Sequence, residues 1–553
     1  MLKNIIYKLT PLIIIVLLCI PVVLPYFHSG YFPTHDGEWA VVRLADMFRT
    51  IRDLQFPPRY SGALNFGYGY PLFNFTYPFP YYLGLVLYFP FHSFIASIKS
   101  IFALSVFLSA IFMYLASNEL WKDKTSAVIS SIFYVYLPYR MVDLFVRGSI
   151  GESLSFALFP LIFYLTLKLF ASPFSRVTVT FLTLSLALLV MTHNIMTVLF
   201  LPVLIFFGIL RIIKEKRWDV LQSFFLCLLL GAGLSFFFWF PALFEKNNIL
   251  LSKIPIANRN LYFVNIQQLL IPSWGFASPT ESGGFSYQLG IPQSIAVVLS
   301  LIFLIVTFIR SKLVQTPFKF YAFILFFMYT VCLLFLFSVT SPIWKGLPLL
   351  KEINYPWTLL SQLGFISSLL AGFLVIQHKY IKYFLIILSV VAIILVLPYA
   401  KPQSYVDRTD SYYITNEATT TSSHELMPVW VKDQPIEHYK NKVEIIGGNA
   451  QISNLKFNSR SLKFNYKADT DTVFQINTIY YPGWKAYLNG EMIKINYDNP
   501  KGVMQIGVSR YRDSVSLIFD ETLPRFIADT VSVISIGIIL FIFLRPLLLF
   551  KTS

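Results

Sequence analysis

The acidic residue Asp36, in the sequence THDGE, directly follows the first apolar segment of the chain. A carboxylate held near a membrane surface can act as a general base toward an acceptor hydroxyl. It can also be an oxygen ligand of a divalent cation such as Mg²⁺ or Mn²⁺. Asp is equally a favoured N-cap residue, so Asp36 can serve only to cap the helix that follows. The neighbouring His35 is expected to lie at the interface or to support Asp36 in substrate binding.

A second group of charges lies in the sequence YRMVDLFVRGSIGES, between two apolar segments. Ionisable groups this close to hydrocarbon usually face a cavity and pair with one another. The guanidinium groups of Arg140 and Arg147 suit a phosphate, which arginine binds bidentately. Asp143 and Glu152 are candidate catalytic acids; either could complete a cation site with Asp36, and we assign Glu152 to it. The alternative is a structural salt-bridge cluster that fixes the loop.

Two further stretches carry polar groups that face the same side of the membrane. His193, in MTHNIM, marks a turn between two apolar segments; a lone histidine is more often structural, but it is a candidate substrate contact. The long segment 241–290 is rich in Gly, Ser and Pro, and loops longer than about 15 residues are often lids. Gln288 in this predicted flap is a candidate contact to a sugar-like ligand, although amide residues at an interface need no such reason.

The composition identifies the setting of these residues. Of 553 residues, 56% are hydrophobic and only 13% are charged, against about 25% charged in soluble domains. The net charge of +16 would by itself suggest nucleic acid, but residues 401–521 hold fourteen basic and fourteen acidic side chains. The basic excess therefore belongs to short loops of an integral membrane protein, as the positive-inside rule requires. The three cysteines lie in apolar runs, which indicates buried thiols without disulfides or metal.

Apolar runs of spanning length predict about twelve transmembrane helices. The first is an uncleaved signal anchor, and both termini are expected in the cytoplasm. Residues 40–54 have helical apolar spacing and predict an amphipathic helix on the membrane surface. The predicted spans are 9–27, 94–117, 125–139, 153–171, 177–192, 195–213, 219–241, 292–310, 318–338, 356–376, 381–399 and 525–546. The external loops are then 28–77, 140–152, 241–290 and 340–355.

Residues 401–523 follow a different pattern, in which apolar and polar residues alternate in segments rich in Val, Ile, Phe and Tyr. This alternation predicts antiparallel strands, and Asn489-Gly490 is a strong two-residue hairpin signal. We expect an extracytoplasmic β-sandwich that serves as a binding or scaffolding module. The chain is thus predicted to have a multi-span membrane domain at 1–400, the β-sandwich at 401–523, and a final transmembrane helix with a short cytoplasmic tail at 524–553.

The order of these features resembles the GT-C superfamily of membrane glycosyltransferases, in which an acid directly follows the first helix and further acids lie in the second external loop. More narrowly, FPTHDGEWAVVRL, PYRMVDLFVRGSIGES, MTHNIM, SSHELMPVW and YYPGWKAYLNG resemble the bacterial membrane-protein family labelled pyruvoyl-tetrahydropterin-synthase-related. The resemblance covers nearly the whole chain, including the β-rich tail.

This resemblance implies transfer of a sugar from a polyprenyl-phosphate-linked donor to a cell-envelope glycan, lipid or protein on the outer face of the bacterial cytoplasmic membrane, usually with inversion. Asp36 would be the catalytic base or metal-proximal acid, Asp143 and Glu152 the second-loop acids, and Arg147 the stabiliser of the leaving phosphate. The two second-loop acids lie nine residues apart, unlike the DxD or ExD pattern of some relatives, which leaves metal dependence open. Membrane lipid is an expected partner and nucleic acid is not.

Two other classes of function remain open from the sequence. A lipid-glycan transporter or flippase would carry ionisable residues near the membrane midplane and broken helices. In this chain the acids gather at one face, which favours an enzyme. A noncatalytic envelope-assembly factor, in which the β-domain binds glycan, is the third class.

Overall fold

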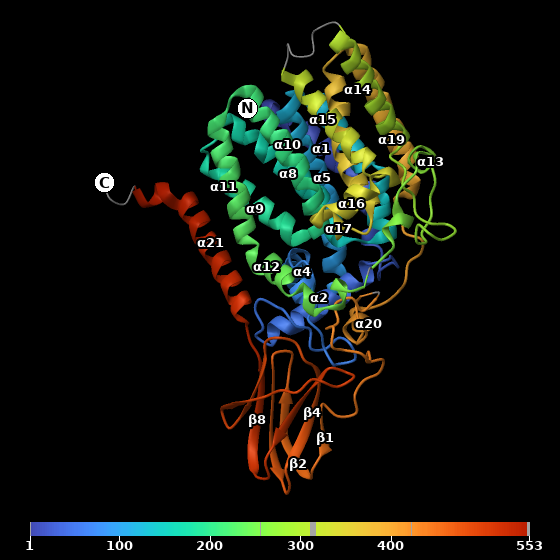
Figure 1. Cartoon of the computed structure of the whole chain (residues 1–553). Helices are drawn as coiled ribbons and strands as arrows, with labels where there is room; N and C mark the ends of the chain where they lie inside the picture. Colours follow the sequence, from blue (N-terminus) through green and yellow to red (C-terminus); the bar gives the residue numbers. More distant parts are fainter. Residues whose placement is uncertain (1, 255, 310–316, 422, 550–553) are drawn as a thin grey trace.

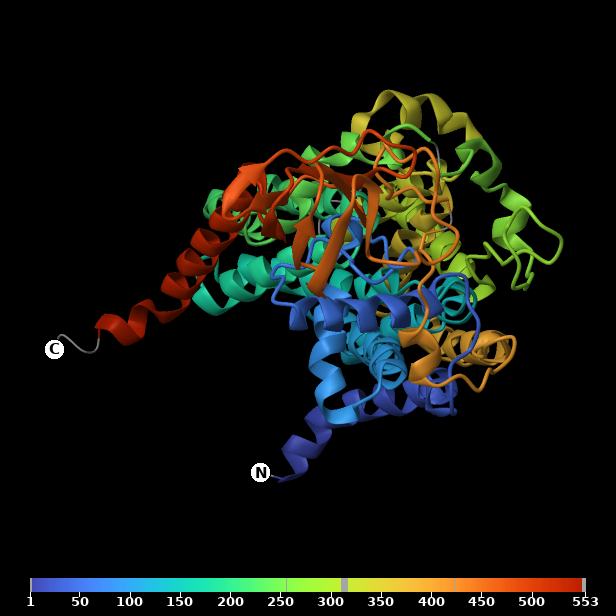
Figure 2. The same ribbon diagram turned by 90° about the horizontal axis from the view of Figure 1, so that it is seen from below.

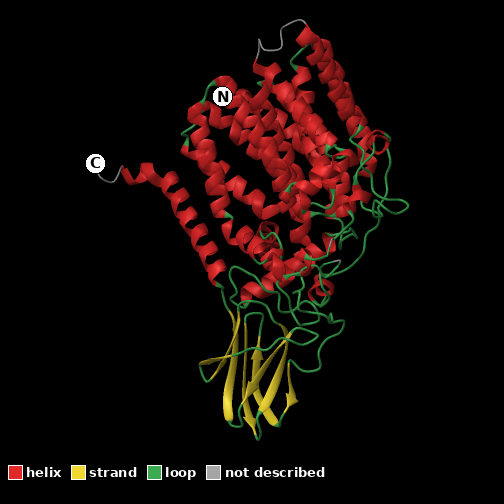
Figure 3. Cartoon of the chain, in the orientation of Figure 1, coloured by secondary structure: helices red, strands yellow, loops and turns green. Residues whose placement is uncertain are grey.

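The computed structural model describes residues 2–254, 256–309, 317–421 and 423–549. A bundle of helices carries a β-sandwich at one end (Figures 1 and 3). Helix α1 begins at the end of the bundle away from the sandwich, and α21 leaves the sandwich and runs toward that same end (Figure 1). Seen from the sandwich end, α21 projects from the side of the bundle (Figure 2).

Nine helices of the described residues are long and apolar enough to cross a membrane, or up to eleven with two bent pairs. The bent pairs are α6 (Lys124–Val135) with α7 (Pro138–Val142) and the π-turn η2 (Asp143–Arg147), and α11 (Trp218–Leu234) with α12 (Phe236–Phe244). The nine are α1 (Leu2–Val23) with its 3-10 extension, α5 (Phe94–Trp121), α8 (Ile150–Ala171), α10 (Asn194–Glu215), α14 (Ile291–Ile309), α15 (Pro317–Leu334), α18 (Leu360–Val375) with the turn before it, α19 (Lys379–Val396) and α21 (Leu523–Leu549).

The remaining predicted span, 177–192, corresponds to α9 (Arg176–Thr192), an apolar helix of 17 residues. Every predicted span therefore has a helical counterpart, and the prediction of a polytopic helical protein with a C-terminal β-domain is confirmed. Residue 310, where one predicted span ends, and residues 550–553 of the predicted C-terminal tail lie outside the described residues.

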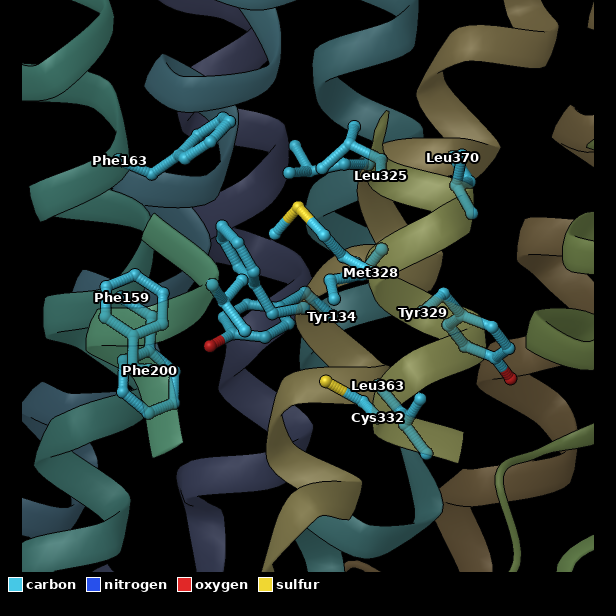
Figure 4. Close-up of a cluster of buried hydrophobic side chains, with 14 of the residues drawn as sticks. Tyr134, Phe159, Phe163, Phe200, Leu325, Met328, Tyr329, Cys332, Leu363 and Leu370 are labelled. Carbon is cyan, nitrogen blue, oxygen red and sulfur yellow. The ribbon is translucent and has the colours of Figure 1, made fainter. Parts of the chain in front are cut away.

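The core of the bundle surrounds α18, every residue of which is buried. Figure 4 shows side chains of α6, α8, α10, α15 and α18 meeting there. The rings of Phe159 and Phe200 stack with centroids 4.4 Å apart, and Phe365 of α18 packs edge-on against Phe163 at 5.5 Å. The cysteines Cys19, Cys227 and Cys332 are buried and free, as the sequence predicts.

Two shorter helices lie at the sandwich end. The predicted amphipathic helix is α2 (Gly37–Arg52), which buries Val41, Leu44 and Met47 and exposes Arg49. The short aromatic helix α4 (Phe79–Phe91) packs beside it, with Leu44 against Gly84. The smaller elements nearby are α3 (Leu72–Phe75), α13 (Ile266–Leu270), α16 (Ser341–Gly346), α17 (Pro348–Lys351) and α20 (Asp410–Ile414).

The β-domain is built of two antiparallel sheets. One has the strand order β1-β4-β7 and the other β2-β3-β8-β5-β6. Their inner faces share a core in which Phe464 of β3 meets Phe474 of β4 with centroids 5.1 Å apart. The strands are β1 (Val443–Gly447), β2 (Ala450–Phe457), β3 (Ser461–Ala468), β4 (Thr472–Ile479), β5 (Trp484–Leu488), β6 (Glu491–Ile493), β7 (Val503–Val508) and β8 (Arg512–Phe519).

The predicted hairpin joins β5 to β6, with Asn489 and Gly490 both at positive φ. The described residues of the segment before the first strand, 401–421 and 423–442, run over the end of the bundle and belong to none of the strands β1–β8. Val406 bridges to Tyr31, and Pro428 bridges to Ile249. These pairings bring a segment from the C-terminal part of the chain beside the 28–77 loop.

A cluster of ion pairs fixes the β-domain to the bundle. Arg525 of α21 donates two hydrogen bonds to Glu245, each 2.8 Å long, and Tyr481 of the β-domain donates a third at 3.0 Å. Arg59 of the 28–77 loop contacts Asp529 at 2.8 Å. The first loop, the end of α12, the β-domain and α21 are therefore held in one arrangement.

Candidate functional site

A cavity of about 440 Å³ opens at the end of the bundle that faces the β-sandwich. Its wall is formed by the start of α2, the turn before α8, the α9–α10 junction, the 241–290 segment and the residues before α18. The lining residues that carry polar side-chain groups include His35, Asp36, Arg43, Tyr77, Tyr81, Arg147, His193, Tyr262, Tyr355 and Glu425.

Asp36 lies at the N-cap position of α2, but its carboxylate does not cap the helix. The Thr34 hydroxyl accepts a hydrogen bond from the Gly37 N–H at 2.9 Å instead. The Asp36 backbone N–H donates to the Arg147 carbonyl at 2.8 Å, which fixes the two residues beside each other. Within the described part of the chain, no side chain forms a hydrogen bond or ion pair with the Asp36 carboxylate, which lines the cavity half-buried.

Gly148 makes this close approach of the 28–77 and 140–152 loops possible. Its φ of +63° lies in the left-handed region, and a Cβ there would come within 2.2 Å of the Thr34 hydroxyl oxygen. Any other residue would be strained and would push the loops apart. The turn at Gly148 therefore allows Asp36 and Arg147 to lie beside each other.

Arg147 is clamped on three sides and still lines the cavity. Its guanidinium contacts the Glu152 carboxylate, lies 3.3 Å from the Tyr139 hydroxyl, and stands over the Trp357 ring at 4.5 Å from the centroid. It ends the π-turn η2, a helix distortion often found at functional sites. This arrangement holds a fixed positive charge next to the free carboxylate of Asp36.

Arg140, Asp143 and Glu152 lie beneath the cavity wall and do not line it. Arg140 contacts Asp143 at 3.2 Å and the Ser105 hydroxyl at 2.7 Å. Ser153 donates to Asp143 at 2.6 Å. These contacts match the structural alternative, a buried salt-bridge cluster that fixes the loop. A catalytic role for Asp143 and Glu152, and substrate binding by Arg140, stay predictions.

The residues predicted to hold a divalent cation do not fit one. Both oxygens of Glu152 are engaged, since Oε1 accepts a 2.6 Å hydrogen bond from Tyr139 and Oε2 contacts Arg147. The carboxylate is fully buried, whereas that of Asp36 faces the cavity. Among the described residues, no group of three or more His, Cys, Asp or Glu side chains is placed to hold a metal ion.

The two predicted histidines both line the cavity, but Gln288 does not. His193 stacks on Tyr77 with centroids 5.3 Å apart and caps α10 by accepting from the Met196 N–H. Burial, and after it the charge of Arg147, lowers the pKa of His193 to about 3, so it is neutral at physiological pH. Gln288 is buried inside the 241–290 segment, where it donates to the Ser273 carbonyl at 2.8 Å.

The predicted flap supplies one side of the cavity. Tyr262 and Phe285 line it, and the Phe276 carbonyl lies 2.8 Å from Nε2 of His35. Trp274 stacks on Tyr399 with centroids 4.4 Å apart. The segment therefore touches both the 28–77 loop and the residues that lead into the β-domain.

Two charged lining residues were not identified from the sequence. Arg43 of α2 donates to the Thr420 hydroxyl at 3.1 Å and lies at the cavity wall. Glu425 comes from the segment before the β-domain, which only the tertiary fold brings to the site. The motif SSHELMPVW, which contains Glu425, was the available signal.

The fold and the cavity define a polytopic helical membrane protein with a charged site at the end of its bundle, beside the segment that precedes its C-terminal β-domain. A family model described as "6-pyruvoyl-tetrahydropterin synthase related domain; membrane protein" matches residues 73–403. The chain belongs to this family, as its motifs predicted. An uncharacterized protein of Lactococcus lactis subsp. cremoris (strain MG1363) is 24% identical over 241 residues, which cover 42% of this chain and 39% of the relative.

Solved structures that resemble this chain include an apo oligosaccharyltransferase of Archaeoglobus fulgidus, with a TM-score of 0.46 and 14% identity over 78% of this chain and 62% of that one. The arabinofuranosyltransferase AftD from Mycobacteria has a TM-score of 0.43 and 14% identity, over 73% of this chain and 28% of that one. The chain thus spans less than two thirds of the length of these proteins.

Proposed function

We propose that this protein is a membrane glycosyltransferase of the GT-C type, which moves a sugar from a polyprenyl-phosphate-linked donor to a cell-envelope glycan, lipid or protein. One observation carries the proposal. A half-buried carboxylate without a partner among the described residues, Asp36, stands beside a clamped arginine, Arg147, in one cavity at the end of the helix bundle.

Asp36 and Arg147 have the charges that sugar transfer needs, a base for the acceptor hydroxyl and a cation for the departing phosphate. The acceptor hydroxyl oxygen attacks the anomeric carbon from the face opposite the phosphate, and the bond from that carbon to the phosphate oxygen breaks. Asp36 takes the hydroxyl proton, and the departing phosphate retains the electron pair of the broken bond. Arg147 stabilises the charge that develops on this oxygen, and fixed positive charge of this kind lowers the barrier strongly.

The clamp around Arg147 supports this role. Because Glu152, Tyr139 and Trp357 hold its guanidinium, little reorganisation is needed when the phosphate departs. His193, neutral at physiological pH, can donate or accept a hydrogen bond without adding charge near the donor. Arg43 offers a second cation across the same cavity.

The place of the cavity suits a donor that stays in the bilayer. A polyprenyl chain keeps the sugar phosphate near the membrane surface, and the cavity lies at the ends of the apolar helices. The basic loops at the far end of the bundle support a cytoplasmic location for that end, by the positive-inside rule. We therefore propose that the cavity and the β-domain lie on the outer face of the bacterial cytoplasmic membrane.

The full chain in nanodiscs is the material for the test. It is given short-chain polyprenyl-phosphate sugars with crude envelope glycan, and mass spectrometry follows the release of polyprenyl phosphate and the mass gained by the acceptor. Turnover of one donor, with the sugar found on the acceptor, supports the proposal. Loss of activity with a chelator would favour the predicted Mg²⁺ or Mn²⁺. A chain that moves the intact donor between leaflets without cleaving it is a flippase, which contradicts the proposal.

A further inference from the structure

A second cavity, of about 710 Å³, lies where α2 and the first external loop meet the β-sandwich. Its volume falls in the range of about 300–1,000 Å³ that is usual for small-molecule sites. Helix α2 separates it from the first cavity, since Asp36 faces one and Asp46 the other. At 1.5 Å per helical residue, these two carboxylates are about 15 Å apart along the helix. The other walls come from residues 414–417, residues 438–442 and the ends of β2, β4 and β5.

The wall contains buried polar groups that form no hydrogen bond with the described residues. Asp46 is 3% exposed, and neither of its carboxylate oxygens accepts a hydrogen bond of ordinary geometry. Its neighbours are the Ser61 hydroxyl and the Arg49 guanidinium, the latter 4.0 Å away. The Thr50 hydroxyl, one helical turn further along α2, is fully buried and also without a partner. Buried polar atoms are almost always paired, so these groups call for donors and acceptors supplied by a ligand.

Aromatic rings complete the wall. Phe457, at the end of β2, is 51% exposed, and Tyr439 is half-buried beside it. The Lys442 ammonium donates to the Gly67 and Asn477 carbonyls at 2.8 Å each and lies 4.8 Å from the Tyr439 ring centroid. The cavity therefore offers both apolar ring faces and polar atoms, a mixture that suits a ligand with hydroxyl groups on an apolar frame.

The charges of the wall balance. Three carboxylates, Asp46, Asp53 and Glu417, face three cations, Arg49, Lys440 and Lys442. A cationic ligand would meet the ammonium and guanidinium groups, and an anionic one would meet the buried carboxylate of Asp46. A neutral ligand rich in hydroxyls avoids both kinds of like-charge repulsion, and its hydroxyls donate the hydrogen bonds that Asp46 lacks.

We propose that this junction cavity is a carbohydrate-binding site for a neutral saccharide, whose hydroxyls donate to Asp46 and whose C–H faces pack on Phe457 and Tyr439. This proposal deepens the proposed function. Only one part of it rests on that function, namely that the bound saccharide is the distal part of the acceptor glycan. Held about 15 Å from Asp36 along α2, such a chain would present its growing end to the first cavity. Binding itself requires no sugar transfer.

The test measures binding of short neutral oligosaccharides of glucose, galactose, mannose or N-acetylglucosamine to the full chain in nanodiscs, by saturation-transfer NMR and calorimetry. Asp46→Leu removes the acceptor and Phe457→Ala removes the exposed ring. Asp46→Leu should weaken binding at least about ten-fold, the worth of one lost hydrogen bond to a charged group. Phe457→Ala should also weaken binding, because the apolar face on which the saccharide packs is lost. Tyr511→Ala, which removes another exposed ring of the same β-domain outside this cavity, is the matched control and should bind as the native chain does.

Folding does not confound the result, because Asp46→Leu removes a buried carboxylate that accepts no hydrogen bond and only meets Arg49 at 4.0 Å, so the melting temperature of the ligand-free protein should rise. Burial raises the pKa of Asp46 to about 6, in keeping with this cost. The proposal is overturned if no neutral saccharide binds the folded protein, if only charged saccharides or peptides bind, or if Asp46→Leu and Phe457→Ala bind as the native chain does. Asp36→Asn should retain binding, so loss of transfer and loss of this site are told apart.

Discussion

Arg147 has two tasks in this account, and a double substitution separates them. In the structure it contacts the buried carboxylate of Glu152 and also lines the cavity. Arg147→Met alone would leave Glu152 buried with only the Tyr139 hydroxyl as a donor. Removing one partner of a buried ion pair costs about 3–5 kcal/mol, so this variant should melt far below the native chain.

The variant Arg147→Met with Glu152→Gln removes both charges. Glutamine keeps an acceptor for Tyr139, and methionine fills the space over the Trp357 ring, so the free energy of unfolding should return to within about 1 kcal/mol of the native value. Donor turnover should nevertheless fall about 100–1,000-fold, because the positive charge next to the leaving phosphate is gone. Thermal melting in detergent and mass-spectrometric donor turnover measure the two effects separately.

A matched control lies at the far end of α10. There Arg211 contacts Glu215 at 2.8 Å, and the Tyr321 hydroxyl also contacts this glutamate, which repeats the Arg–Glu–Tyr arrangement away from the cavity. Arg211→Met with Glu215→Gln should leave turnover within about two-fold of native, since neither group meets the donor. If the Arg147 and Glu152 double variant turns over donor at the native rate, Arg147 does not stabilise the leaving group. If the double variant melts as far below the native chain as Arg147→Met does, the unpaired Glu152 carboxylate does not explain the low stability of Arg147→Met.

Burial lowers the pKa of Lys442 from 10.5 to about 7, so the unfolded chain binds more protons than the folded chain between these pH values. Stability should therefore rise with pH through this window, and Lys442→Met should flatten the slope measured by melting at several pH values. Arg525→Met should cost about 3–5 kcal/mol because it leaves Glu245 buried with only neutral donors, and melting curves should show this loss. Trp357→Leu removes the ring under Arg147 and should slow donor turnover about ten-fold.

Each of these three predictions would be contradicted by a specific result. A native slope of stability with pH in Lys442→Met would show that another group is responsible. Native melting of Arg525→Met would mean that the ion pairs do not hold the β-domain to the bundle. Unchanged donor turnover in Trp357→Leu would show that Arg147 does not need the Trp357 ring for its role in transfer.

Much of the fold follows from local patterns in the sequence. Long apolar runs predict the spanning helices because an unpaired backbone is too costly in hydrocarbon. Alternation predicts most of the β-domain, and Asn489-Gly490 marks its hairpin because both residues tolerate positive φ. Strand β2 was not predicted: it lies at the edge of its sheet, is mostly exposed and bears a bulge near Asn454, so its sequence shows little alternation.

The site was less predictable, because it depends on contacts between distant segments. Asp36 and Arg147 were identified as charges next to apolar runs, but only the fold shows that the Asp36 N–H donates to the Arg147 carbonyl. Glu425 joins them from nearly 400 residues away, and no local pattern places it there. Glu152 and Gln288 have the side chains expected of a site, yet the structure buries both away from the cavity. Residue type alone does not decide between a ligand contact and an internal pair.

The most direct test of the central claim compares donor turnover by the native chain, Asp36→Asn and Glu38→Gln. Glu38 lies two residues beyond Asp36 but pairs with Arg408 at 2.6 Å and does not line the cavity. The account predicts that native protein and Glu38→Gln release polyprenyl phosphate at similar rates, and that Asp36→Asn loses at least about 100-fold because the proton acceptor is gone. Native turnover in Asp36→Asn would contradict the assignment of this cavity as the catalytic site.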